Sequence, residues 1–167
     1  LSDTMDFHSP TTTDRDIQTA NILAAIADLD IDTFAEEMFR ITSNQEKMSF
    51  SDMLNQDLKI YDLFSCKLSI SQVIVPSAKE MRTDSREILA ALDRFAQKKR
   101  IDLAVLVFTS ILENGSVIYA GGSRAPWAAE AFPNADGEDH SFQENLLSRK
   151  QQILPALTGV ITEYIGG

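Results

Sequence analysis

The chain has 167 residues, of which 44% are hydrophobic and 24% charged, and its formal net charge is −10. This composition predicts a globular protein, and the acidic charge argues against a nucleic-acid-binding surface, which needs a broad basic face. No apolar run approaches the roughly 20 residues of a membrane helix, and the N-terminus lacks the basic-then-apolar order of a secretion signal, so we expect a cytoplasmic protein with neither nucleic-acid nor membrane partners.

The first 43 residues predict a pair of helices. Residues 11–14 offer several N-cap side chains for the first helix, and Asp30 or Asp32 precedes the second. The apolar faces contain Ile22, Leu23, Ile26 and Leu29 in the first helix and Phe34, Met38 and Ile41 in the second. Segment 44–48 is polar and has no periodicity, so we interpret it as a hinge between a domain of residues 1–43 and a domain of residues 49–167.

The second domain begins with a capping box at Ser49 and Asp52, which predicts a short helix. From about Asp57 the pattern becomes extended, and residues 68–75 predict a strand that stops at a proline. Apolar spacing predicts a long helix over residues 84–99.

Residues 103–108 are evenly apolar, which predicts a central strand covered on both faces. Asn114-Gly115 predicts a hairpin into an antiparallel strand over 116–120, and residues 125–132 predict a short helix with Trp127 facing the core. The fold class expected is α/β, a mixed β-sheet flanked by helices and preceded by the N-terminal helix pair.

Two other features have a structural interpretation. Gly121-Gly122 could form an anion-binding nest, but glycines that end a strand usually make a turn. Cys66 cannot form an internal disulfide, because it is the only cysteine, and we interpret it as a small strand residue without chemistry.

A basic pair stands where a helix is expected to begin. Ser148 with Gln151 three residues later predicts a capping box, which makes Arg149 and Lys150 first-turn residues. Helix N-termini favour anions over cations, so free amides together with these two cations form a candidate site for phosphate or carboxylate. The alternative interpretation is a solvated basic pair. Pro155 predicts that this first helix is short or kinked and that another begins there.

One set of residues spans nearly the whole chain: Leu1-Ser2-Asp3-Thr4, Ser9-Pro10-Thr11, Asp14, Lys59 after Leu54 and Asp57, the strand and hairpin of 101–120, and Ser148-Arg149-Lys150 with Gln152 and Pro155. Taken together, these segments resemble the manganese-dependent (family II) inorganic pyrophosphatases of the DHH phosphoesterase superfamily.

The resemblance implies an N-terminal domain with two metals and a smaller C-terminal domain, of the second DHH-associated type, that closes over pyrophosphate. Residues 1–43 would then be the tail of the metal domain and residues 49–167 the complete substrate-binding domain, with most of the metal domain missing. The complete enzyme would use Mn²⁺, with Co²⁺ or Mg²⁺ as alternatives, to hydrolyse pyrophosphate to two phosphates. This chain is expected to supply no catalytic residue and therefore to be inactive alone. Its C-terminal domain is expected to require no cofactor by itself.

In residue terms, the resemblance implies that Asp3 is a metal ligand and that Lys59, Arg149 and Lys150, with the helix start at Ser148, hold the phosphates. Two positions depart from the family. His8 stands where a lysine is common, and we interpret it as a solvated side chain rather than a metal ligand. Gln151 replaces the second lysine of the usual Ser-Arg-Lys-Lys-Gln segment.

Two alternative functions remain open at this point. The chain could be a free-standing regulatory module that binds phosphate compounds without turnover, or half of an exopolyphosphatase. The Ser-Arg-Lys segment favours pyrophosphate. The partners expected are pyrophosphate or phosphate, the missing N-terminal metal domain and, as a candidate assembly, a second copy in a homodimer.

Overall fold

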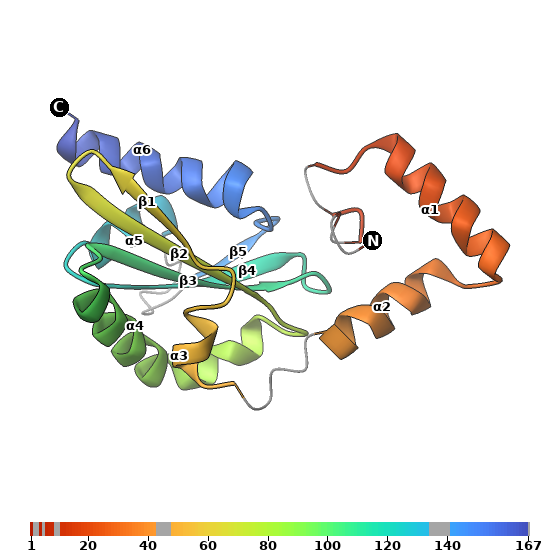
Figure 1. Cartoon of the computed structure of the whole chain (residues 1–167), viewed down its shortest axis with the longest axis horizontal. Coiled ribbons are helices and arrows are strands. Elements are labelled where there is room, and N and C mark those ends of the chain that lie inside the picture. Colours follow the sequence, from red (N-terminus) through yellow and green to blue (C-terminus); the bar gives the residue numbers. More distant parts are fainter. Residues whose placement is uncertain (2–3, 5, 9–10, 43–47, 134–140, 167) are drawn as a thin grey trace. The chain divides into compact units, whose positions relative to one another are not determined.

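The computed structural model describes residues 1, 4, 6–8, 11–42, 48–133 and 141–166. The chain divides into two compact units, Leu1–Glu46 and Lys47–Gly167, and each is described by itself (Figure 1). The predicted hinge, 44–48, lies outside the described residues except for Met48, so its role stays a prediction.

The first unit contains the predicted helix pair, α1 (Asp14–Ala27) and α2 (Ile31–Thr42). Thr13 caps α1 through a capping box with Asp16, and Asp28 ends the helix in the left-handed conformation. Of the two acids proposed to cap α2, Asp30 does so, because its carboxylate accepts the Thr33 N–H at 2.9 Å. No residue of α1 is buried; Ala20 and Ala24 are half-buried and the other residues of this helix are exposed.

The second unit is built on a mixed five-stranded sheet, which confirms the predicted α/β class. In spatial order its strands are β1 (Lys59–Leu63), β2 (Cys66–Ile74), β3 (Leu103–Ser110), β4 (Gly115–Gly121) and β5 (Ser141–Glu144). Only β2 and β3 pair in parallel; every other neighbouring pair is antiparallel. The edge strand β5 was not predicted.

The central strand β3 is buried along its whole length, as its even apolar run predicted. One face of the sheet packs against α3 (Phe50–Met53), the 3-10 turn η1 (Lys79–Asp84) and α4 (Ser85–Lys99). The other face packs against α5 (Ala125–Ala131), the π-turn η2 (Arg149–Ile153) and α6 (Leu154–Ile165) (Figure 1). No helix among those described is both long and apolar enough to cross a membrane.

The hairpin signal at Asn114-Gly115 is confirmed, but its glycine has another role than the one predicted. Ser110 pairs with Gly115, so the loop is residues 111–114 and Gly115 already belongs to β4. A Cβ at this position would lie 2.6 Å from the carbonyl oxygen of Gln143, because β5 approaches closely. Asn114 provides the left-handed backbone of the loop, with φ 47°.

Candidate anion-binding site

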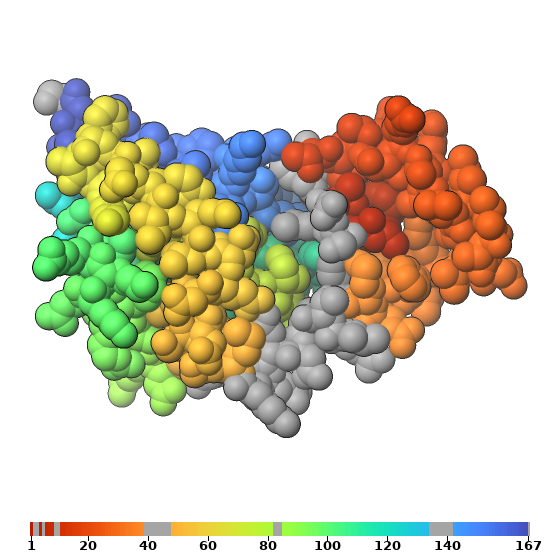
Figure 2. All heavy atoms as spheres, in the orientation of Figure 1, coloured from red at the N-terminus to blue at the C-terminus, as the bar shows by residue number. Residues whose placement is uncertain are grey.

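Two of the predicted cations lie near each other because the connection into β1 contacts the start of the C-terminal helix. The guanidinium of Arg149 binds Asp57, which lies two residues before Lys59. Figure 2 shows the two segments side by side on one face, the first in orange to yellow and the second in blue. Since two residues of chain span at most about 7 Å, this contact brings the Lys59 backbone close to the Arg149 guanidinium.

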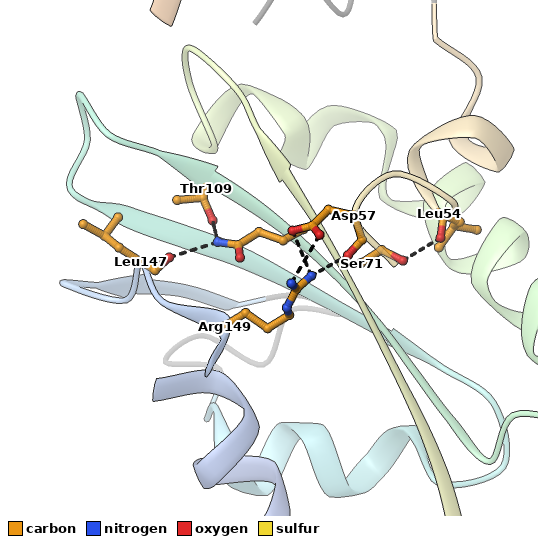
Figure 3. A network of polar contacts seen from close by, with 7 residues as sticks. Leu54, Asp57, Ser71, Thr109, Leu147 and Arg149 are labelled. Atoms are coloured by element: carbon orange, nitrogen blue, oxygen red, sulfur yellow. Dashed lines mark hydrogen bonds and ion pairs between the residues drawn. The ribbon is translucent and has the colours of Figure 1, made fainter. Parts of the chain in front are cut away.

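Three contacts join Arg149 to Asp57 (Figure 3). Nη1 lies 2.9 Å from Oδ2 and also donates to the backbone carbonyl oxygen, while Nη2 donates to Oδ1 at 3.3 Å. The Arg149 side chain is 15% exposed and that of Asp57 is 53% exposed. The guanidinium is therefore fixed in orientation at the edge of the core rather than free in solvent, which excludes the interpretation of Arg149 as a merely solvated side chain.

The strand pattern places Lys59 on the sheet face that carries α6. Side chains alternate along a strand, so Lys59 shares a face with Tyr61 and Leu63, and both of these pack against the cluster that contains α6 residues. Its cross-strand partner Ile70 belongs to the same cluster. Lys59 is exposed at the start of β1, and it therefore projects from the same face as Arg149.

The structure places Lys150 beside Arg149 in η2, with an exposed side chain that forms no ion pair within the described residues. Within the described residues, the segment that carries Lys59 forms hydrogen bonds and an ion pair with Arg149 through Asp57, and none of these interactions involves Lys150. The association of Lys59 with Arg149 is thus supported by geometry, whereas that of Lys150 rests on chain proximity alone.

Ser148 caps the helix as predicted, but the reciprocal partner differs by one residue. Its hydroxyl accepts the Gln151 N–H at 3.2 Å, while the side chain of Gln152, not Gln151, accepts the Ser148 N–H at 2.8 Å. The predicted capping box is wrong in this half because the first turn is a π-turn, and its additional residue brings Gln152, rather than Gln151, over the cap. Pro155 favours the wide turn, since it lacks an N–H and would crowd the carbonyl four residues earlier in an α-helix.

The loop before Ser148 is anchored by polar side chains of the sheet that were not predicted. Gln72 donates through Nε2 to the carbonyl oxygen of Leu147 and to the Thr109 hydroxyl, both at 2.9 Å (Figure 3). Ser116 donates to the carbonyl oxygen of Leu146 at 2.5 Å. The signal for these residues in the sequence was polar side chains at the ends of otherwise apolar buried strands.

Two other features are structural in this fold. The Gly122 amide donates to the Asp93 carboxylate at 2.9 Å, so the anion-nest alternative at Gly121-Gly122 is already satisfied by a side chain of α4. Cys66 is buried, and burial, with a smaller effect of Asp102, raises the pKa of its thiol. A protonated thiol is a poor nucleophile, which agrees with the absence of assigned chemistry at Cys66.

The predicted metal ligand, Asp3, lies outside the described residues. His8 is exposed. Over the described parts of the chain, no group of three or more His, Cys, Asp or Glu residues lies where it could hold a metal ion. The described residues therefore do not fit a metal centre by themselves, and the chemistry they support is the binding of an anion by cations and amides.

The chain is similar in sequence to one domain family and to several inorganic pyrophosphatases. The DHHA2 domain family matches residues 36–160. The manganese-dependent inorganic pyrophosphatase of Bacillus subtilis (strain 168) is 31% identical over 163 residues, which cover 98% of this chain and 53% of that protein. The cobalt-dependent inorganic pyrophosphatase of Clostridium perfringens is 32% identical over 165 residues, covering 99% of this chain and 30% of that protein.

A solved structure agrees with the fold. A Methanococcus jannaschii protein named as a candidate family II inorganic pyrophosphatase superposes with a TM-score of 0.79 at 31% identity, over 99% of this chain and 52% of that one. The present chain thus spans about half the length of the Bacillus relative and of this structure.

Proposed function

This chain belongs to the DHHA2 domain family, and we propose that it is the substrate-binding part of an inorganic pyrophosphatase. In this proposal the complete protein hydrolyses pyrophosphate to two phosphates, with Mn²⁺ or, as in one relative, Co²⁺ as the metal. Asp3 would be a metal ligand, and a domain that supplies the remaining ligands would face the substrate from the other side.

The observation that carries the proposal is the fixed guanidinium of Arg149 beside the start of β1. A guanidinium held in one orientation next to a second cation, Lys59, suits an oxyanion with several phosphate oxygens. The chain has a net charge of −10, so it repels a large polyanion over most of its surface. A local pair of cations can still attract a small anion, and charge complementarity therefore favours a small anion as the ligand.

The helix start adds donors to these cations. The Gln152 side chain accepts the backbone N–H groups of Leu147 and Ser148. The next two N–H groups, of Arg149 and Lys150, have no hydrogen-bond partner within the described chain and can bind a ligand. The π-turn leads directly into the α6 helix, so its amide dipoles favour negative charge at Ser148. In the proposed reaction these groups would hold and neutralise the phosphates, a positioning and electrostatic role without proton transfer.

The first experiment uses the complete protein. Phosphate release from pyrophosphate should be measured with Mn²⁺ in wild type, in Arg149→Ala and in Arg94→Ala, which removes an equal charge on the opposite face of the sheet. We expect turnover on the order of 1–10³ per second for wild type and the control variant. A wild type that releases phosphate from long polyphosphate but not from pyrophosphate would indicate an exopolyphosphatase instead.

A second measurement separates enzyme from binding module. We expect the isolated 167-residue chain to bind pyrophosphate weakly and to release no phosphate, because its described residues contain no metal centre. Turnover by the isolated chain at ordinary enzymatic rates would contradict the proposed division of labour. A complete protein that binds pyrophosphate and never hydrolyses it would support the regulatory-module alternative.

A further inference from the structure

We infer that Asp57 is a positioning residue: it holds one edge of the Arg149 guanidinium so that the opposite edge is presented to a phosphate group. The inference rests on the proposed function, because it needs Arg149 to contact substrate. It concerns a residue for which the sequence patterns indicated no role, and it assigns a particular pair of N–H donors to the ligand.

The donors of Arg149 divide into two sets. A guanidinium carries N–H groups along an end edge, formed by Nη1 and Nη2, and along a side edge, formed by Nε and Nη2. The Asp57 carboxylate faces the end edge, since Oδ2 lies 2.9 Å from Nη1 and Oδ1 accepts a hydrogen bond from Nη2 at 3.3 Å. The Asp57 carbonyl oxygen accepts a hydrogen bond from Nη1. Among the described residues, Nη2 makes one hydrogen bond and carries two N–H groups, so the side edge keeps Nε–H and one parallel N–H of Nη2 for a ligand.

No described residue accepts a hydrogen bond from Arg149 Nε. Two parallel N–H groups on one guanidinium match the spacing of two oxygens on a phosphate, which is the bidentate geometry that distinguishes arginine from lysine. The side edge is therefore a preformed fork. A phosphate bound there would not compete with Asp57, because the carboxylate occupies different donors.

The opposite possibility is that Asp57 stands in for substrate and must be displaced. Two observations argue against it. The Asp57 backbone carbonyl oxygen shares the guanidinium with the carboxylate, and that oxygen belongs to the connection between α3 and β1, not to a mobile side chain. Moreover, the Arg149 side chain is only 15% exposed, so displacement would require this largely covered guanidinium to lose its ion pair.

The backbone of Asp57 decides which variants are informative. Asp57 has φ 42°, a left-handed conformation that Asn and Gly adopt readily and Ala does not. Asp57→Asn removes the charge and one strong acceptor, and Asp57→Gly removes the whole carboxylate, while both keep the carbonyl contact. The matched control is Asp62→Asn in β1, because Asp62 is exposed and its side chain makes no hydrogen bond or ion pair with a described residue.

The kinetic test uses the complete protein and a double-mutant cycle. We expect Asp57→Asn and Asp57→Gly to lower kcat/KM for pyrophosphate about 10- to 100-fold, the loss expected from a misplaced binding group. In an Arg149→Ala background the same changes should have no further effect, because Asp57 acts only through Arg149. An undiminished loss in that background, or a lower KM in either Asp57 variant, would overturn the inference.

A spectroscopic test on the 167-residue chain reports the fork directly. In wild type, titration with pyrophosphate should shift the Nε–H resonance of Arg149 and slow its exchange with water, while in Asp57→Gly the shift should be reduced or lost. Retention of the wild-type shift in Asp57→Gly would refute a positioning role. No response of wild type to pyrophosphate in either test would instead refute the proposed function, so the two failures are distinguishable.

Discussion

The side-chain oxygen of Gln152 accepts the backbone N–H of Ser148 at 2.8 Å, so a residue of the first turn of the C-terminal helix binds the N-cap amide. The same oxygen accepts the N–H of Leu147 at 3.0 Å, and the Gln152 amide nitrogen donates to the carbonyl oxygen of Asn145 at 2.8 Å. The Gln152 side chain thus stabilises the loop that precedes Arg149. The adjacent residue Gln151, not Gln152, has the spacing of a standard capping box.

This arrangement predicts different effects for the two adjacent glutamines. Gln152→Ala should lower the free energy of unfolding by about 1–3 kcal/mol, because it leaves partly buried amides without an acceptor. Gln151→Ala should stay within about 0.5 kcal/mol of wild type, since the Gln151 side chain is exposed and makes no hydrogen bond to a described residue. Urea unfolding of the two variants decides the matter, and equal losses would contradict the assignment of Gln152 as the capping partner.

The two cations of the helix start should contribute unequally to pyrophosphate hydrolysis. In the complete protein, Arg149→Ala should reduce kcat about 10²- to 10³-fold, the range for loss of one preorganised charge-stabilising donor. Lys150→Ala should cost less, because an ammonium acts mainly as a point charge whereas the Asp57-bound guanidinium is fixed in orientation. Steady-state kinetics measure both values. A larger effect of Lys150→Ala would show that the fixed guanidinium is not the main anion contact.

The elements that could be predicted from the sequence are those whose signal is local and repeated. The apolar run over residues 103–108 indicated the buried central strand β3, and the apolar positions over residues 84–99 indicated α4. The N-cap signals in residues 11–14 and at Ser49 are local, and Thr13 and Ser49 are observed as the N-caps of α1 and α3. The strand β5 was missed because an edge strand of four residues, Ser141–Glu144, has too little pattern.

The predicted site was incomplete because its contacts are distant in sequence. Lys59, Arg149 and Lys150 were named from a basic pair and a family resemblance, but the partner that fixes Arg149 lies 92 residues away in the chain. Gln72 holds the Leu147 carbonyl across 75 residues. Such pairs are set by the tertiary arrangement of segments outside the strands, and a periodicity argument cannot give them. The shift from Gln151 to Gln152 has a local cause, the π-turn before Pro155, which a template for α-helices does not contain.

The helix pair of the first unit should be the less stable part of the chain. No residue of α1 is buried, and Ile22 and Ile26 are 61% and 77% exposed, so little apolar burial stabilises this helix. A groove of 390 Å³ between α1 and α2, lined by residues that include Leu23, Phe34 and Met38, offers an apolar surface for self-association. Hydrogen exchange should therefore be faster in α1 and α2 than in β3.

Sedimentation at increasing concentration measures the self-association of this chain. We expect a homodimer that weakens in Leu23→Ser, because Leu23 lines the groove and is exposed. Gln18→Ser, at an exposed polar position of the same helix, should behave as wild type. A strict monomer in which α1 amides exchange as slowly as those of β3 would contradict both the instability and the pairing.

The helix starts of this unit should also make its helicity sensitive to acid. The Thr13 side chain, through its hydrogen bond, lowers the pKa of Asp16 from its ordinary value of 3.8, and the hydrogen bond from the Thr33 N–H lowers that of Asp30 in the same way. A carboxylate whose pKa is lower in the folded state than in the unfolded state stabilises the folded state fully above pH 3.8. This contribution is lost as the pH falls through the pKa of the folded state. Circular dichroism should show α1 and α2 losing helix below pH 3.8 at a temperature where the sheet stays folded.

Asp16→Asn should weaken this acid response, because the amide cannot gain or lose the charge. Asp14→Asn removes a first-turn charge that makes no capping bonds, and it should preserve the acid response. Carboxyl NMR titration of Asp16 gives the direct check, and a midpoint at or above 3.8 would show that the capping box contributes no acid-sensitive stability.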